Sequence, residues 1–204
     1  MNNMNIQNSN INFLAKHLFT DKIKKLDENT GSFLPENVYF AEIEHYKKSD
    51  RDSVNTLRES WSDAKFIKII ANTLNWAQVY NAKNTKIYAL TEQSENFGDL
   101  LPEKILGLAH ITELSKRNAI LEYMQIKPEA INVNKKKDIK YKGSGSVLLN
   151  SLKQIYNKIV LNAVADENIY KFYKRNGFRR SLFSMNTFIW HCNPVTFIKR
   201  LINK

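Results

Sequence analysis

Apolar residues recur at helical spacing near the start of the chain. They lie about one helical turn apart, after a polar, asparagine-rich tail, and so predict a helix with a single apolar stripe. The stripe consists of Ile11, Leu14, Leu18 and Ile23. Turn-forming residues follow in Asp27–Pro35. We therefore expect residues 1–35 to be an N-terminal extension, helical and docked on a domain that occupies residues 36–204.

The rest of the chain changes between helical and strand-like patterns. Helices are expected at Ser49–Trp61, Ser62–Trp76, Gly145–Tyr156 and Asp166–Asn176. Strands are expected at Val38–Ile43, Lys86–Glu92, Lys104–Glu113, Ala119–Ile126, Ile159–Val164 and within Phe178–Trp190. Two helices thus come first, then a meander of strands, then alternating helix and strand. This order predicts a single α/β domain of the α+β kind, built on one sheet of mixed polarity.

Composition limits the class of protein. The 204 residues are 43% hydrophobic, which is enough to bury a sizeable core. No apolar run approaches the roughly 20 residues that span a bilayer, and the N-terminus lacks the features of a signal peptide. We expect a cytoplasmic protein without a membrane partner. The single cysteine, Cys192, excludes an internal disulfide and any multi-cysteine zinc site.

The net charge of +11 has two interpretations. It could attract a polyanion, or it could reflect a solvated, lysine-rich surface. The charge is scattered, apart from Lys135–Lys137 and the stretch Lys174–Arg180. We favour the solvated surface, and nucleic acid is the weaker expectation for a partner.

Two glycines precede the helix expected at Gly145–Tyr156. Gly143 and Gly145 allow a tight turn and a close approach of the backbone to a ligand. The first N–H groups of a helix have no internal partner, and the helix dipole adds partial positive charge. Lys140 and Lys142 add full charges beside them. The segment predicts an anion site, although a flexible loop before an ordinary helix is an alternative reading.

Two common phosphate motifs do not fit this segment. A Walker loop would need Gly-Lys-Ser/Thr at a fixed spacing, which is missing. A dinucleotide fingerprint would need a third glycine where Leu148 stands.

The motifs resemble those of the GNAT superfamily of N-acetyltransferases. Lys140-x-x-Gly143-x-Gly145 is similar to its pyrophosphate loop, with lysine in the first place, and Ile126-Lys-Pro128 is similar to the strand end before that loop. Phe172-Tyr173 followed by Gly177-Phe178 is similar to the family's late helix, and Leu106–Ile111 to the strand before the central one. The resemblance covers residues 36–192. Two features depart from it, a long insertion at Glu129–Ile139 and Asp166 as the helix cap where asparagine is usual.

This resemblance implies a mostly antiparallel, twisted sheet flanked by helices and a direct transfer of acetyl from acetyl-CoA to a primary amine. Acetyl-CoA would be a co-substrate, and no metal would be needed. Tyr173 would be the general acid for the departing thiolate, although a tyrosine packed in the core is the plain alternative. The residues expected to bind the cofactor are Met124, Gln125, Ile126, Lys140, Lys142, Gly143, Ser144, Gly145 and Ser146.

The sequence leaves open which residue would act as the base that takes a proton from the acceptor amine. Glu122 is the first candidate, because strand alternation, barring a bulge, places it on the same face as Met124 and Ile126, and a buried or half-buried carboxylate could hold a raised pKa. A solvent-facing glutamate is the alternative reading. Glu113, His110 and a water chain are rivals.

Other functions share parts of this pattern. A non-catalytic acyl-CoA-binding module would keep the two glycines without needing Tyr173 or Glu122. A nucleic-acid-binding protein would rest on the charge alone. The acceptor, whether a small molecule or a protein amine, is not encoded in a recognisable motif, and homodimerisation is open.

Overall fold

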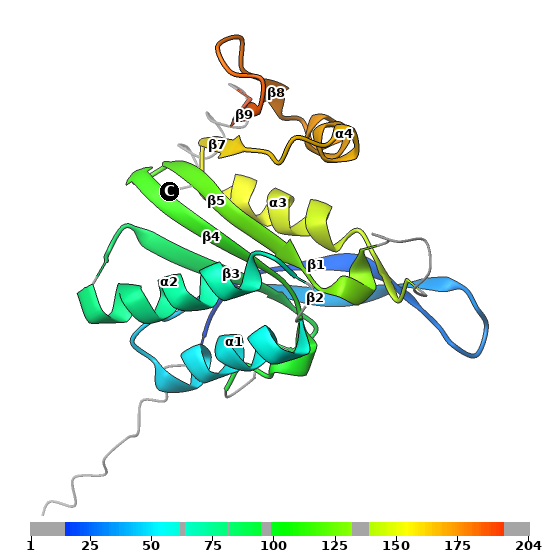
Figure 1. Ribbon diagram of the computed structural model, residues 1–204. Coiled ribbons are helices and arrows are strands. Elements are labelled where there is room, and N and C mark those ends of the chain that lie inside the picture. Colours follow the sequence, from blue (N-terminus) through cyan, green and yellow to red (C-terminus); the bar gives the residue numbers. More distant parts are fainter. Residues whose placement is uncertain (1–14, 62–63, 81, 95–98, 132–138, 194–204) are drawn as a thin grey trace, which may run out of the picture.

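The computed structural model describes residues 15–61, 64–80, 82–94, 99–131 and 139–193. Within these residues nine strands form one sheet in the order β6-β1-β2-β3-β4-β5-β7-β9-β8 (Figure 1). Neighbouring strands are antiparallel, except that β5 and β7 are parallel. The strands are β1 (Lys16–Leu26), β2 (Phe33–Ile43), β3 (Thr85–Thr91), β4 (Ile105–Ser115), β5 (Asn118–Ile126), β6 (Tyr141–Lys142), β7 (Lys158–Asn162), β8 (Arg179–Arg180) and β9 (Thr187–His191).

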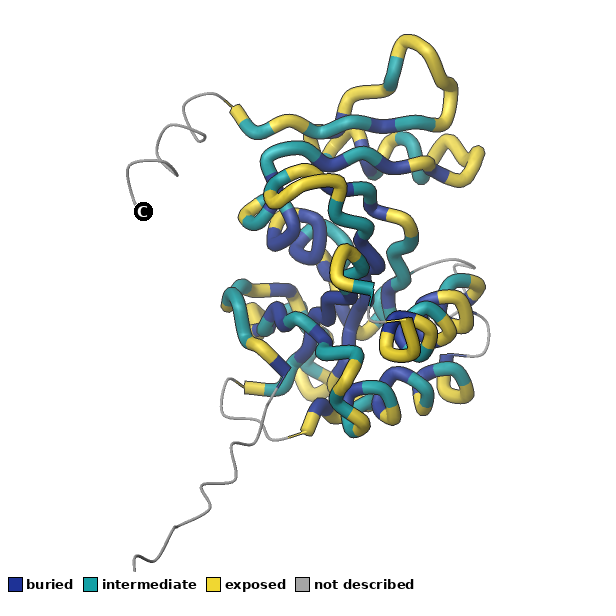
Figure 2. The backbone as a smooth tube through the Cα atoms, turned by 90° about the vertical axis from the view of Figure 1, so that its left-hand side faces the viewer, coloured by how far each residue is buried: buried dark blue, intermediate teal, exposed yellow. Residues whose placement is uncertain are grey.

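In the same described residues, four α-helices cover the two faces of the sheet. They are α1 (Lys48–Ser60), α2 (Ile67–Tyr80), α3 (Ser144–Ile155) and α4 (Glu167–Arg175), and two short 3-10 helices lie at Pro102–Lys104 and Pro128–Ala130. One core cluster lies between the sheet and α1 and α2, and a second contains residues of α3 and Tyr173 of α4. Buried residues accordingly follow the strands and the inner faces of the helices (Figure 2). The predicted class, an α+β fold with a mixed and mostly antiparallel sheet, is confirmed.

Most predicted elements are present, with shifted ends. The helix predicted at Asp166–Asn176 is α4, and both of its ends could be predicted because the signals for them lie in neighbouring residues. Asp166 caps α4, and its carboxylate accepts hydrogen bonds from the N–H groups of Asn168 and Ile169 at 2.8 and 3.1 Å. Gly177 follows the helix with φ of 76°, a left-handed conformation that favours glycine.

The prediction of an N-terminal helix is wrong for the residues that the structure describes. Residues 16–26 form β1, which pairs with β2 from Lys16↔Glu42 to Leu26↔Phe33. Only Leu18 and Ile23 of the predicted stripe lie inside the described residues. The backbone hydrogen bonds of β1 come from a partner strand that lies later in the chain, so helical spacing over a few apolar residues did not decide its structure. Residues 16–35 therefore contribute to the sheet itself.

The 129–139 insertion is described only at its two ends. Residues 132–138 lie outside the described residues. Lys140 donates its backbone N–H to the carbonyl of Glu129 at 3.0 Å, so the ends of the insertion meet. Among the described residues, no helix is long and apolar enough to cross a membrane.

Strand β1 should be needed for stability, because Ile23 is its one fully buried apolar side chain in the α3-side core. We expect Ile23→Ala to lower the free energy of unfolding by about 2–5 kcal/mol, since it leaves a cavity. Urea titration would measure this. Lys22→Ala, on an exposed neighbour in the same strand, should change stability by less than about 0.5 kcal/mol. Equal effects of the two variants would contradict a packing role for β1.

Candidate active site

The start of α3 has the features of an anion site. Gly143 is its N-cap, with φ of 95°, and no side chain caps the helix. The first turn carries no acidic residue. Ser144 is 2% exposed, and its Oγ has no hydrogen-bond partner among the described residues. Free N–H groups, a helix dipole over 12 residues and a buried unpaired hydroxyl therefore meet at one point, where an anion would satisfy them.

Gly145 brings three distant segments together. A Cβ built on it would lie 3.1 Å from Phe172 Cζ of α4 and 3.6 Å from Ile126 Cγ1 at the end of β5. The absence of a side chain at Gly145 thus lets the start of α3 approach both elements. The loop of residues 140–145, called the glycine loop below, thus meets the end of β5 and the helix that carries Tyr173 at this glycine.

The edge of β5 is open on one side next to this loop. β5 pairs with β7 only from Asn118↔Lys158 to Leu121↔Leu161. Beyond that point, Glu122–Ile126 has no strand partner on the β7 side among the described residues. Free backbone groups along an edge can pair with an extended ligand as another strand would. The predicted cofactor residues Met124, Gln125 and Ile126 lie in this free stretch.

The side chain of Gln125 is held in place on the α2 side of β5. Its Oε1 accepts a hydrogen bond from the backbone N–H of Phe66 at 3.3 Å, and its Nε2 donates to the carbonyl of Ile126 at 3.1 Å. Gln125 therefore ties β5 to the segment before α2. Its contribution to a ligand would come from its backbone.

Tyr173 lies beside the point where the two strands separate. Its ring packs against Phe188 of β9, with centroids 5.7 Å apart, and Phe188 pairs with Leu161 of β7. Leu161 in turn pairs with Leu121, the last residue of β5 that has a partner in β7. Tyr173 is 9% exposed, and burial raises the pKa of its phenol to about 12.

Glu122 does not follow the expected alternation. The register between β4 and β5 shifts there, because His110 pairs with Tyr123 and Ile111 with Leu121. Glu122 is the extra residue of a β-bulge. The prediction that alternation places it on the face of Met124 and Ile126 is therefore wrong. Its side chain is exposed, which also removes the expectation of a half-buried carboxylate.

The two rivals for the base have different surroundings. Glu113 accepts a hydrogen bond from Tyr156 at 2.9 Å, and the hydroxyl of Tyr156 also lies 2.9 Å from that of Tyr88. These two hydrogen bonds anchor the end of α3 to β3 and β4. His110 is 7% exposed and lies on the other face of the sheet, against the ring of Tyr123 at 5.9 Å. Burial lowers the pKa of His110, and the negative charge of Glu122 acts against this effect.

Lys140 and Lys142 contact the β1–β2 hairpin. Lys140 Nζ lies 3.7 Å from Glu28 Oε1, and Lys142 Nζ lies 3.6 Å from the centroid of the Phe33 ring. The backbone N–H of Leu26 also donates to the carbonyl of Lys140 at 2.8 Å. Both lysines are close to Gly143 and Gly145 in the sequence, but their side chains contact the β1–β2 hairpin.

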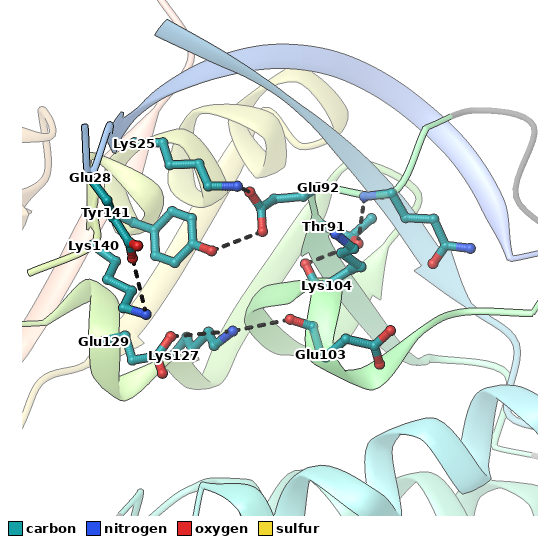
Figure 3. A network of polar contacts seen from close by, with 11 residues as sticks. Lys25, Glu28, Thr91, Glu92, Glu103, Lys104, Lys127, Glu129, Lys140 and Tyr141 are labelled. Atoms are coloured by element: carbon teal, nitrogen blue, oxygen red, sulfur yellow. Dashed lines mark hydrogen bonds and ion pairs between the residues drawn. The ribbon is translucent and has the colours of Figure 1, made fainter. Parts of the chain in front are cut away.

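A buried carboxylate holds this arrangement in place (Figure 3). Glu92 has a side chain that is 6% exposed, and it accepts hydrogen bonds from Lys25 at 2.6 Å and from the hydroxyl of Tyr141 at 3.0 Å. Tyr141 and Lys25 pair between β6 and β1. Sequence patterns did not point to Glu92, Lys25 or Tyr141, because their roles depend on β1 being a strand.

Comparisons with known proteins reveal a similarity in structure. No family model matches the sequence, and no curated protein matches it either. A protein assigned to the GNAT family of acetyltransferases from Desulfovibrio desulfuricans is 11% identical over 76% of this chain and 98% of its own, with a TM-score of 0.49. The AtaTR structure bound with acetyl-CoA is 14% identical over 82% of this chain and 98% of that chain, with a TM-score of 0.47. The N-acetyltransferase PseH of Campylobacter jejuni, in complex with acetyl-CoA, is 13% identical over 74% and 95%, with a TM-score of 0.44.

The burial of Tyr173 can be tested by titration. We expect its phenol to lose its proton near pH 12, about two units above the ordinary value near 10, because burial disfavours the charged form. NMR of protein with ¹³C-labelled tyrosine rings would follow each phenol, and Tyr173→Phe would identify the signal. An ordinary titration near pH 10 in the folded protein would contradict the enclosed position.

Proposed function

We propose that the chain transfers an acetyl group from acetyl-CoA directly to a primary amine. One observation carries the proposal. The candidate anion site at α3, the free edge of β5 and the helix of Tyr173 meet at Gly145, which lies against both Phe172 and Ile126. The start of α3 fits a pyrophosphate, and the free edge of β5 fits an extended, amide-bearing arm such as pantetheine. A thioester at the end of that arm would lie near the helix of Tyr173.

The pyrophosphate would bind at the N-terminus of α3. The N–H groups of the first turn, at Ser144, Gly145 and Ser146, would donate to its oxygens, and the buried hydroxyl of Ser144 would gain a partner. Lys140 and Lys142 would supply charge from the loop, with Lys140 leaving its weak contact to Glu28. Acetyl-CoA would act as a co-substrate, and the chemistry asks for no metal.

The arm of the co-substrate would lie along β5. Met124, Gln125 and Ile126 would pair with its amides through their backbone groups, in the place that β7 leaves free. This contact requires an extended ligand more than particular side chains. The acetyl group would then lie towards Glu122 and Tyr173, where the two strands separate.

Tyr173 is the proposed general acid. Because its phenol pKa is raised to about 12, it is protonated at neutral pH, which is the form that can donate to the departing thiolate. Glu122 is the proposed base through which the proton that leaves the amine reaches solvent, because it is exposed and stands in the bulge at the end of the free edge. An ammonium ion that becomes an amide loses two protons, of which one reaches the thiolate and one reaches the solvent.

Acetyl-CoA affinity should depend on Gly143. We expect Gly143→Ala to weaken acetyl-CoA binding by roughly 10-fold, because a left-handed residue with a Cβ costs about 1–2 kcal/mol and the loop would move to relieve it. Calorimetric titration with acetyl-CoA would measure this. Gly31→Ala is the matched control, since Gly31 is also left-handed, at φ of 67°, and a Cβ added there would meet nothing within 4 Å. Unchanged affinity in both variants would contradict the site.

Acetyl transfer should need the hydroxyl of Tyr173. The test measures CoA release with spermidine, tyramine and lysine methyl ester as acceptors. We expect at least one amine to raise CoA release above hydrolysis, and Tyr173→Phe to lower its turnover by roughly 100-fold or more at unchanged acetyl-CoA affinity. If none of the three amines raises CoA release above hydrolysis, acetyl transfer to these amines is contradicted. Full activity of Tyr173→Phe would remove the acid role alone.

A further inference from the structure

His110 combines burial with an unused polar atom. It lies in β4, it is 7% exposed, and its Nδ1 has no hydrogen-bond partner among the described residues. A buried polar atom without a partner costs about 1–3 kcal/mol, so stability alone does not account for an imidazole at this position. A role in proton transfer is one of the explanations that such a buried, unpaired atom can have.

Its surroundings are aromatic and border the proposed site. The imidazole stacks on Tyr123 of β5 with an interplanar angle of 18°. Tyr123 contacts Phe66, just before α2, at 5.4 Å between ring centroids. On the other side, His110 pairs with the apolar Ile87 of β3. Its row of the sheet thus faces α2, opposite the face that α3 covers.

The charged and titratable groups that act on His110 come from β5. Glu122 in the bulge is the charged group that raises the pKa of the imidazole, against the larger lowering by burial. Tyr123 is the titratable ring in contact with it. Ile87 of β3, which pairs with His110, and Phe66 before α2, which contacts Tyr123, carry no charge. His110 therefore stays neutral at pH 7, with a nitrogen free to accept a proton.

We propose that His110 accepts the proton of the acceptor amine on the α2 side of the bulge and passes it to Glu122, which releases it to solvent. This inference rests on the proposed acetyl transfer. The cationic amine first gives one N–H proton to the imidazole, and its nitrogen, now neutral, then bonds to the acetyl carbon. The carbon–sulfur bond breaks as Tyr173 protonates the thiolate, and the second proton that the nitrogen loses restores the phenol of Tyr173. The exposed carboxylate of Glu122 then connects the buried imidazole to water.

The position of each group supports this division of roles. Glu113, the other carboxylate considered, is engaged by Tyr156 on the opposite face of the sheet. Glu122 is exposed and can exchange protons with water, whereas His110 is enclosed. Tyr123, which contacts both His110 and Phe66, also brings an aromatic ring to this place, and such rings attract the ammonium form of an amine. The acceptor class that fits is thus a primary amine that arrives as a cation.

The experiment compares three variants in the full chain. His110→Gln keeps a polar side chain but cannot take a proton at neutral pH, and His110→Phe keeps a flat ring without nitrogen. His45→Gln is the control, because His45 follows β2, which β3 and β4 separate from β5 in the sheet. Acetyl-CoA affinity is measured by calorimetry, and CoA release is followed from pH 5 to 9 with spermidine, tyramine and lysine methyl ester.

We expect both His110 variants to bind acetyl-CoA like the wild type and to lose roughly 100-fold or more in amine-dependent turnover. In the wild type, kcat/KM should rise with pH through a pKa below 6.5, and this limb should vanish in His110→Gln. His45→Gln should match the wild type. A His110→Gln profile with the same limb and rate would overturn the proposal. Normal acetyl-CoA binding without amine-dependent release in the wild type would instead remove the proposed acetyl transfer itself.

A second measurement does not depend on the acceptor or on how the His110 variants fold. NMR would follow the imidazole pKa of His110 in the wild type and in Glu122→Gln. Loss of the negative charge should lower this pKa further, because Glu122 is what raises it. An unchanged pKa in Glu122→Gln would show that the two groups are not coupled and would overturn the relay.

Discussion

β5 separates from β7 after Leu121, and the strand edge that this frees is what the candidate site is built around. Parallel strands that stay paired would use their backbone groups on each other. Here Tyr123–Ile126 keep partners in β4, and on the β7 side they have no strand partner among the described residues. The loop before α3 reaches this edge because Gly145 has no side chain, and α4 brings Tyr173 to the point of separation. A ligand with an anion at one end and an extended amide chain matches that geometry.

The glycine loop owes its position to the other end of the sheet. β1 pairs with both β2 and β6, and Glu92 joins Lys25 to Tyr141 in an enclosed set of hydrogen bonds. A carboxylate this buried is stable only with its partners in place, since an unpaired charge would be costly away from water. The network therefore links the N-terminal strand to the segment that would hold a pyrophosphate. The lysines of the loop take part through Glu28 and Phe33.

Burial shifts the pKa of one titratable group on each face of the sheet. On the face of α3 and α4, it keeps the phenol of Tyr173 protonated. On the face of α2, it keeps the imidazole of His110 neutral. The same physical effect thus favours the neutral form of both groups, because loss of water disfavours the charged form of each. The bulge at Glu122 lies between them and provides a carboxylate that water can reach.

The sequence by itself determined the elements whose signals are local. Helical spacing, the cap at Asp166 and the stop at Gly177 located α4, and the two glycines located the start of α3, because capping and left-handed turns depend on a few neighbouring residues. The order of elements also determined the fold class. Tertiary structure decided the rest. β1 is a strand only because β2 and β6 pair with it, and the face of Glu122 depends on a register shift against β4. The burial that tunes Tyr173 and His110 likewise comes from segments distant in the chain, which no local pattern records.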